Sequence, residues 1–209
     1  MKKTFKLVAI AVLCTFASKS NLNAQVFEKG DMVIDTYYGF PNLYTAVFEA
    51  AYSSSVTNNS MSVKSIGPVG GRFEYMVSDR VGLGLDIGFN NSKIAYNEQD
   101  VDQNFNPVTY NYNFSTQKLG VMATFNYHFL QNADKFDLYG VFGIGYGNRS
   151  YTYESTNPNY VATTIKTPIP IASRLGIGMR YMIIDNVGIN LGLGVGQGGL
   201  INTGFSFKF

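Results

Sequence analysis

The sequence of 209 residues has very few of two reactive side chains, since it contains one cysteine and one histidine. The cysteine, Cys14, lies in an apolar run near the amino terminus, so residues 25–209 have none. A chain without cysteine has neither a disulfide framework nor a thiol nucleophile. Both are therefore excluded for residues 25–209.

Long hydrophobic runs are also absent after Gln25, where no stretch approaches the roughly 18 consecutive apolar residues of a transmembrane helix. The mean hydropathy of −0.01 resembles that of a soluble protein. However, alternation of apolar and polar residues gives the same average while it collects the apolar residues on one face of a strand. The average is therefore compatible with a membrane protein built from strands.

The amino terminus has the layout of a secretory signal peptide. A basic start, Met1-Lys2-Lys3, is followed by an apolar run too short to span a membrane, and the small residue Ala24 precedes Gln25. We therefore predict that residues 1–24 are a cleaved signal peptide. A lipoprotein is disfavoured because Cys14 lies inside the apolar run, after the large residue Leu13.

Cleavage of the predicted signal peptide also changes the net charge of the chain. This segment carries four lysines and no acidic residue, so its removal changes the formal net charge from +2 to −2, with 12 basic and 14 acidic residues remaining. The basic excess belongs to the signal peptide, and nothing favours nucleic acid as a partner.

Period-two alternation dominates residues 25–209. In Val81–Phe89, for example, every odd position is apolar, and the even positions hold glycine or Asp86. We predict eight such strands, each close to the length of a tilted strand that crosses a bilayer. They are Asp31–Phe40, Ile66–Met76, Val81–Phe89, Lys118–Phe129, Phe136–Tyr146, Ile169–Tyr181, Val187–Val195 and Asn202–Phe209.

The connections between these strands alternate in length. Val77–Arg80, Leu130–Lys135 and Ile183–Asn186 are short, and the segments on the other side are long and polar, except for a tight Gln197–Gly199. The long ones are Pro41–Val63, Ile94–Ser115 and Tyr151–Ile165. Short periplasmic turns and longer external loops are typical of outer-membrane barrels. An even number of strands places both termini at the periplasmic end.

The last strand carries Phe205, Phe207 and Phe209 on one face. The chain offers no later segment to cover that face, so we expect it to contact lipid. A sheet in lipid must close, because an open edge would leave backbone groups unpaired. We therefore predict an all-β fold: a transmembrane, eight-stranded, antiparallel up-and-down β-barrel formed by residues 25–209.

The whole chain resembles the outer membrane protein β-barrel domain family, which includes small barrels similar to OmpX and the membrane part of OmpA. The resemblance is carried by Asn23-Ala24-Gln25, by the glycine-rich strands Gly82–Gly88 and Gly188–Gly196, and by the terminal Phe209. It implies a place in the outer membrane of a Gram-negative cell. It also implies that the barrel assembly machinery reads Phe205, Phe207 and Phe209 as its C-terminal signal.

Charged residues lie on the face opposite the apolar one and are expected inside the barrel. They are Asp35, Arg72, Glu74, Asp86, Lys118, Arg174, Arg180 and Lys208. Eight strands leave an interior that side chains just fill, and buried charges must be paired. We therefore favour a polar network that plugs the lumen over an ion path. A soluble ligand-binding barrel would instead keep its apolar face inside.

Three other motifs favour no chemistry. Gly194–Gly199 fits a dinucleotide-binding pattern, but the required helix does not follow it. His128 is predicted to face the lumen at the periplasmic end, whereas a lipid-A-deacylase-type site needs a lipid-facing histidine near the outer rim. The acidic loop with Glu98 and Asp100 lacks calcium-loop spacing. We expect no catalytic, cofactor or metal site.

The sequence therefore predicts a structural or interaction role, in which the barrel presents its outer loops. The tyrosines and asparagines of those loops could contact an external ligand. A narrow channel for small solutes or ions is the alternative, and a lipid-modifying enzyme is less favoured.

Overall fold

The computed structural model describes residues 25–42, 46, 61–101, 105–131 and 133–209. The predicted signal peptide, residues 1–24, and most of the first predicted loop lie outside the described residues. No helix in the described ranges is long and apolar enough to cross a membrane.

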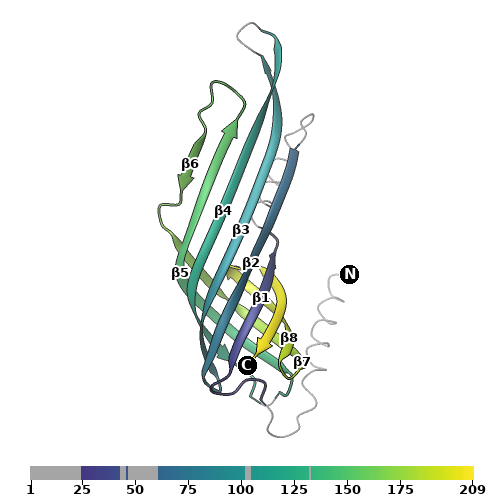
Figure 1. Cartoon of the computed structure of the whole chain (residues 1–209), viewed down its shortest axis with the longest axis vertical. Helices are drawn as coiled ribbons and strands as arrows, with labels where there is room; N and C mark the ends of the chain where they lie inside the picture. Colours follow the sequence, from purple (N-terminus) through teal and green to yellow (C-terminus); the bar gives the residue numbers. More distant parts are fainter. Residues whose placement is uncertain (1–24, 43–45, 47–60, 102–104, 132) are drawn as a thin grey trace, which may run out of the picture.

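Nine strands form one antiparallel sheet in the described part of the chain (Figure 1). They are β1 (Met32–Phe40), β2 (Met61–Ser78), β3 (Val81–Val101), β4 (Pro107–His128), β5 (Phe136–Ser155), β6 (Thr163–Lys166), β7 (Ile171–Ile184), β8 (Val187–Gly196) and β9 (Ile201–Lys208).

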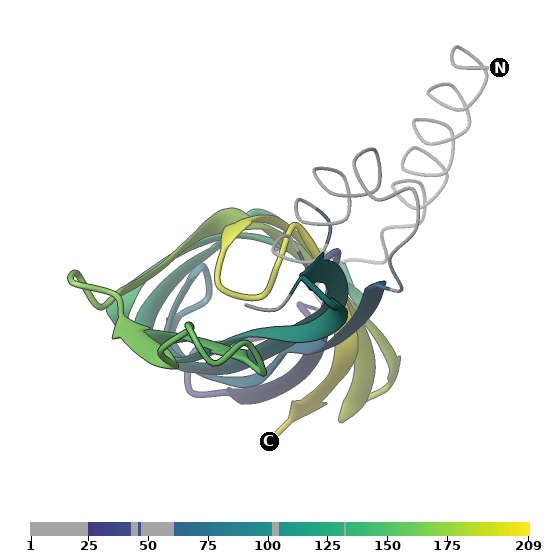
Figure 2. The same cartoon turned by 90° about the horizontal axis from the view of Figure 1, so that it is seen from above.

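Eight of these strands close into a ring, which Figure 2 shows from one end. Each strand pairs with its neighbour in sequence, except that β5 pairs with β7 and the short β6 pairs only with the far end of β5. The ring closes where β1 pairs with β9, for example through Ile34 opposite Phe207. The predicted fold class, an eight-stranded antiparallel up-and-down barrel, is confirmed.

Alternation decides which side chains fill the barrel. On β3, Leu83, Leu85 and Ile87 point outward and are about half exposed, whereas Asp86 between them is completely buried. Inward glycines leave the space that long inward side chains occupy. A Cβ on Gly178 would collide with the ring of Tyr139, and a Cβ on Gly82 would collide with the carboxylate of Glu74.

One end of the barrel carries the short turns, and we call it the short-turn end. The turns lie between β2 and β3, β4 and β5, and β7 and β8, as predicted. Both described ends of the chain also lie here. Gln25 donates a hydrogen bond to the carbonyl oxygen of Asp79 in the turn between β2 and β3, and Phe209 exchanges two backbone hydrogen bonds of 3.1 and 2.9 Å with Met32. The opposite end is called the outer end below.

The strands differ greatly in length, which corrects one prediction. β2 to β5 have 18 to 22 residues, whereas β1, β8 and β9 have 8 to 10. The segment predicted as a loop from Ile94 to Ser115 is mainly strand, paired in register from Ile94–Phe114 to Val101–Pro107. Hydrogen bonds between strands do not require aliphatic side chains, and the many asparagines, tyrosines and acidic residues of this segment made it resemble a loop. Figure 1 shows this extension rising beyond the barrel.

Candidate functional site

The lumen contains a compact ion-pair cluster near the short-turn end, which we call the lower layer: Asp35, Glu74, His128, Asp137 and Arg180. Arg180 Nη2 lies 2.8 Å from Asp35 Oδ2 and 2.6 Å from Glu74 Oε2, and Nη1 lies 3.2 Å from Asp137 Oδ2. These residues come from β7, β1, β2 and β5. One guanidinium thus joins four strands across the lumen.

His128 links two of these carboxylates. Its Nδ1 lies 2.8 Å from Asp137 Oδ1, and its Nε2 lies 3.0 Å from Glu74 Oε1. Each ring nitrogen thus faces a carboxylate whose other oxygen accepts a hydrogen bond from Arg180. This arrangement suits the protonated imidazole, which donates from both nitrogens. The lower layer therefore holds two positive and three negative groups.

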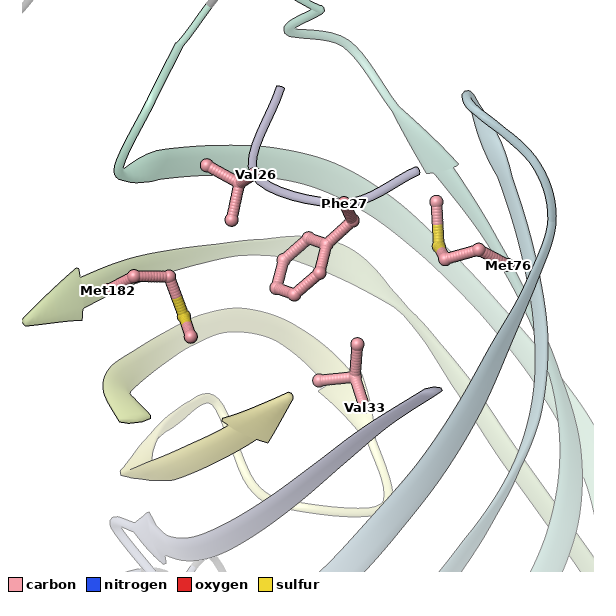
Figure 3. Packing of buried hydrophobic residues seen from close by; sticks show 5 residues of the cluster. All are labelled: Val26, Phe27, Val33, Met76 and Met182. Atoms are coloured by element: carbon pink, nitrogen blue, oxygen red, sulfur yellow. The ribbon is translucent and has the colours of Figure 1, made fainter. Parts of the chain in front are cut away.

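The amino-terminal segment closes the barrel below this layer (Figure 3). Phe27 is 2% exposed and packs in a hydrophobic cluster with Val26, Val33, Met76 and Met182. Its ring centroid lies 5.3 Å from the guanidinium carbon of Arg180. Lys208 fixes the segment by donating to the carbonyl oxygen of Val26 at 2.7 Å and pairing with Asp31 at 2.8 Å.

A second cluster, the outer layer, fills the lumen toward the outer end: Tyr37, Arg72, Asp86, Arg174 and Gln197. Three donors converge on the Asp86 carboxylate. Arg72 Nε lies 2.8 Å from Oδ2, and the Tyr37 hydroxyl and Gln197 Nε2 lie 2.9 and 2.7 Å from Oδ1. One carboxylate thus compensates two buried arginines in this layer.

Arg174 is the poorly compensated member. Its Nη1 donates to the backbone carbonyl of Gln197, but its buried Nε and Nη2 have no hydrogen-bond partner among the described residues. Across both layers, four cationic groups face four carboxylates. The charges therefore balance in total, with one excess negative charge in the lower layer and one excess positive charge in the outer layer.

Six of the eight predicted lumen residues lie buried in these two layers: Asp35, Arg72, Glu74, Asp86, Arg174 and Arg180. Lys118 and Lys208 do not join them. Lys208 is partly exposed at the short-turn end, where it holds the amino-terminal segment. Lys118 is partly buried at the outer end, beside a small cavity.

Sequence reasoning missed other members of the lumen network. Gln197 was expected at the tip of a hairpin, but its side chain turns inward to Asp86, because the turn bends at Gly196 and Gly198, which both have positive φ. Asp137 went unnoticed although it also alternates with outward apolar residues, which is the signal that could have found it. Tyr37 was not predicted to face the lumen, because tyrosine is compatible with either face of a barrel strand.

Beyond the barrel, the inner face of β3, β4 and β5 becomes aromatic. We call this surface the aromatic face: Tyr96, Tyr112, Phe114, Tyr151 and Tyr153. The rings of Tyr96 and Tyr112 stack with centroids 5.2 Å apart, and the hydroxyl groups of Tyr96 and Tyr153 lie 3.0 Å apart. Glu98 and Asp100 lie exposed farther along β3.

Several solved structures are similar to this chain, including the following three. The N-terminal β-barrel domain of Pseudomonas aeruginosa OprF is 15% identical with a TM-score of 0.45, and the match covers 88% of this chain and 100% of that chain. The outer membrane protein OprG from Pseudomonas aeruginosa is 13% identical with a TM-score of 0.46, covering 90% and 99%. Ail, the attachment invasion locus protein of Yersinia pestis, is 12% identical with a TM-score of 0.43, covering 87% and 99%.

The described strands of this chain form an eight-stranded antiparallel barrel. No family model matches the chain, and no curated protein matches it either. At these identities and scores the three structures give no information about the role of this chain.

Proposed function

We propose that this protein is an outer-membrane barrel that is closed to solutes and acts by presenting its outer extension to external ligands. The exterior supports the location, since apolar side chains such as Leu85, Ile177 and Phe205 are half or more exposed around the ring. A water-soluble protein would bury such a band, whereas lipid solvates it. The short-turn end would then face the periplasm.

The observation that carries the closed state is that two layers of buried side chains, each held by its own contacts, fill the lumen at successive heights. Phe27 lies against Arg180, whose guanidinium also stacks on the ring of Tyr139 at 4.2 Å. In the outer layer, Arg72 covers the ring of Tyr37 at 4.3 Å and pairs with Asp86, which Gln197 caps. A buried charge without its partners costs several kcal/mol, so these groups oppose opening.

The outer extension supports the interaction role. Its aromatic face projects past the ends of β1, β8 and β9, and the rings hold one another in place through stacking. Tyrosine offers a rigid, amphipathic contact surface at a small cost in side-chain entropy. Residues of this kind on a rigid three-stranded ribbon are suited to contact a ligand outside the cell.

Planar-bilayer conductance of the refolded chain tests the closed state. We expect no discrete conductance steps, because both layers and the Phe27 cap obstruct the lumen. Circular dichroism and heat-modified gel mobility of the same sample must show a folded barrel, so that failed insertion does not imitate a closed lumen. Regular single-channel steps from the wild-type chain would contradict the proposal and favour the narrow channel.

A further inference from the structure

A small cavity lies at the outer end of the lumen, directly beyond the outer layer. Its volume is about 40 Å³, and Asn90, Lys118, Arg149, Gln197 and Gly198 are among the residues that line it. Asn90, Lys118 and Arg149 form one row across β3, β4 and β5, because Asn90 pairs with Lys118 and Lys118 pairs with Arg149 in the register. Two cations therefore stand side by side on one wall.

This wall carries two like charges, Lys118 and Arg149, on neighbouring strands. Like charges directly opposite each other on neighbouring strands repel, and no acidic residue is among the described residues that line the cavity. The ammonium group of Lys118 makes no hydrogen bond or ion pair with the described part of the chain. Arg149 is oriented by a hydrogen bond of 3.2 Å from its Nη1 to Thr116 Oγ1.

The floor of the cavity adds positive charge. Gln197 and Gly198 line it, and the guanidinium of Arg174 lies directly against both of them, with Arg72 close behind. Arg174 is 1% exposed, and its Nε and Nη2 have no partner in the described ranges. In the described part of the outer layer, Asp86 is the carboxylate that pairs with Arg72. A low-dielectric hollow lined by one sign of charge concentrates the opposite sign.

We propose that this cavity binds an oxyanion, namely a phosphate, sulfate or carboxylate group held by Lys118 and Arg149. Guanidinium and ammonium groups form short, charge-assisted hydrogen bonds with such oxygens. The volume exceeds the roughly 10–15 Å³ that one water needs, and it suits a single oxyanion group. Binding places negative charge beside the ammonium of Lys118, which has no partner in the described part of the chain, and offsets the excess positive charge of the outer layer.

The occupant is either a free ion or the anionic group of a larger ligand. Tyr151 and Tyr153 lie two and four residues beyond Arg149 on the same face of β5. Successive residues of a strand rise by about 3.3 Å, so a ring attached to the anion lies within reach of the aromatic face. In both cases the cavity binds an anionic group in the same way. The aromatic face contributes to binding only if that group belongs to a larger ligand.

Titration of the refolded full chain in detergent micelles with inorganic phosphate tests the site. Ionic strength is held constant with sodium chloride, so that general screening stays the same. We expect saturable binding, with the largest changes in the amide resonances of Gln197 and Gly198. This measurement on the wild-type chain stands even if a variant fails to fold. Unsaturable shifts, or shifts confined to exposed lysines, would overturn the proposal.

Lys118→Met should weaken phosphate binding about tenfold or more, which corresponds to about 1.4 kcal/mol, whereas Lys118→Arg should retain it. Lys93→Met is the matched control, because Lys93 is exposed and lies on the outward face of the neighbouring strand β3. An equal loss in the Lys93 and Lys118 variants, or no loss in Lys118→Met, would contradict a defined site.

Glucose 6-phosphate as a second probe distinguishes the two sources. If it binds more tightly than inorganic phosphate, and if Tyr151→Ala removes that advantage, the site holds the anionic group of a larger ligand. Equal affinities of the two probes assign the site to the free ion. Failure of both probes to bind rejects the oxyanion site but leaves the closed barrel, which the conductance experiment tests separately.

Discussion

Arg180 and Arg174 lie on the same face of β7, six residues apart, and each is 1% exposed, yet their surroundings differ. Three carboxylates surround Arg180, and its Nε, Nη1 and Nη2 all donate to them. Arg174 donates to one backbone carbonyl and stands beside another arginine. The two arginines are thus equally buried, but Arg180 has carboxylate partners for all three of its nitrogens, whereas the charge of Arg174 is poorly compensated.

This difference separates two uses of buried charge. A buried ion pair with all its hydrogen bonds made is costly to break, because removing one partner leaves the other charges buried without compensation. The lower layer therefore fixes the positions of five strands, β1, β2, β4, β5 and β7. The outer layer keeps unused hydrogen-bond donors and an excess positive charge, which is the property expected next to an anion-binding cavity. Three substitutions test this distinction by urea unfolding in lipid vesicles.

Arg180→Leu should have the largest effect. It leaves the carboxylates of Asp35, Glu74 and Asp137 buried with only His128 to compensate them, so we expect a loss of about 3–5 kcal/mol in the free energy of unfolding. The unfolding midpoint in urea measures this loss. A loss below about 1 kcal/mol would mean that water enters the lower layer and that the lumen is less closed than the contacts indicate.

Asp86→Asn should have an intermediate effect. The amide keeps the shape and can still accept from Tyr37 or Gln197, but it no longer compensates Arg72 and Arg174. A hydrogen bond to a charged group contributes about 1.5–3 kcal/mol, so a loss in that range is expected. If the proposed oxyanion site exists, added phosphate should restore part of this stability. An identical loss with and without phosphate would argue against the coupling.

Arg174→Met should have the smallest effect. The substitution gives up one hydrogen bond to the Gln197 carbonyl, but it also removes a buried charge whose desolvation is poorly compensated. We expect a loss below about 1 kcal/mol, because these two contributions largely cancel. Unfolding in the same vesicles as Arg180→Leu provides the comparison. A loss as large as that of Arg180→Leu would show that the two arginines are equally well compensated.

The sequence predicts the barrel because alternation is a local property. The strands, their faces and the short turns follow from residues two apart, as Leu83, Leu85 and Ile87 show. Alternation also places Arg72 and Arg180 on the inner face, but it does not give the height at which each one lies. Lys208 shares that face and yet ends at the short-turn rim.

The contacts across the lumen are not predictable in this way. Arg180 meets Asp35, Glu74 and Asp137 because of the tilt and offset of strands that are not all neighbours in the sheet, and these are properties of the closed ring. Phe27 precedes the first strand and has no periodic pattern around it. The outer extension mixes tyrosines with asparagines and acidic residues and has no run of aliphatic residues on one face, so its strands resemble loops in the sequence.

The sequence separations within the lower layer have a consequence for how the chain folds. Arg180 is 145 residues from Asp35, 106 from Glu74 and 43 from Asp137, and Asp35 also accepts a hydrogen bond from Ser206, 171 residues away. Hairpins form between neighbours, but these contacts require the first and last strands to meet. Until then the same charges are hydrated and keep one face of the unfinished sheet compatible with water. Closure of the ring and dehydration of the charges are therefore a single late event, and a partly closed barrel gains little from its ion pairs.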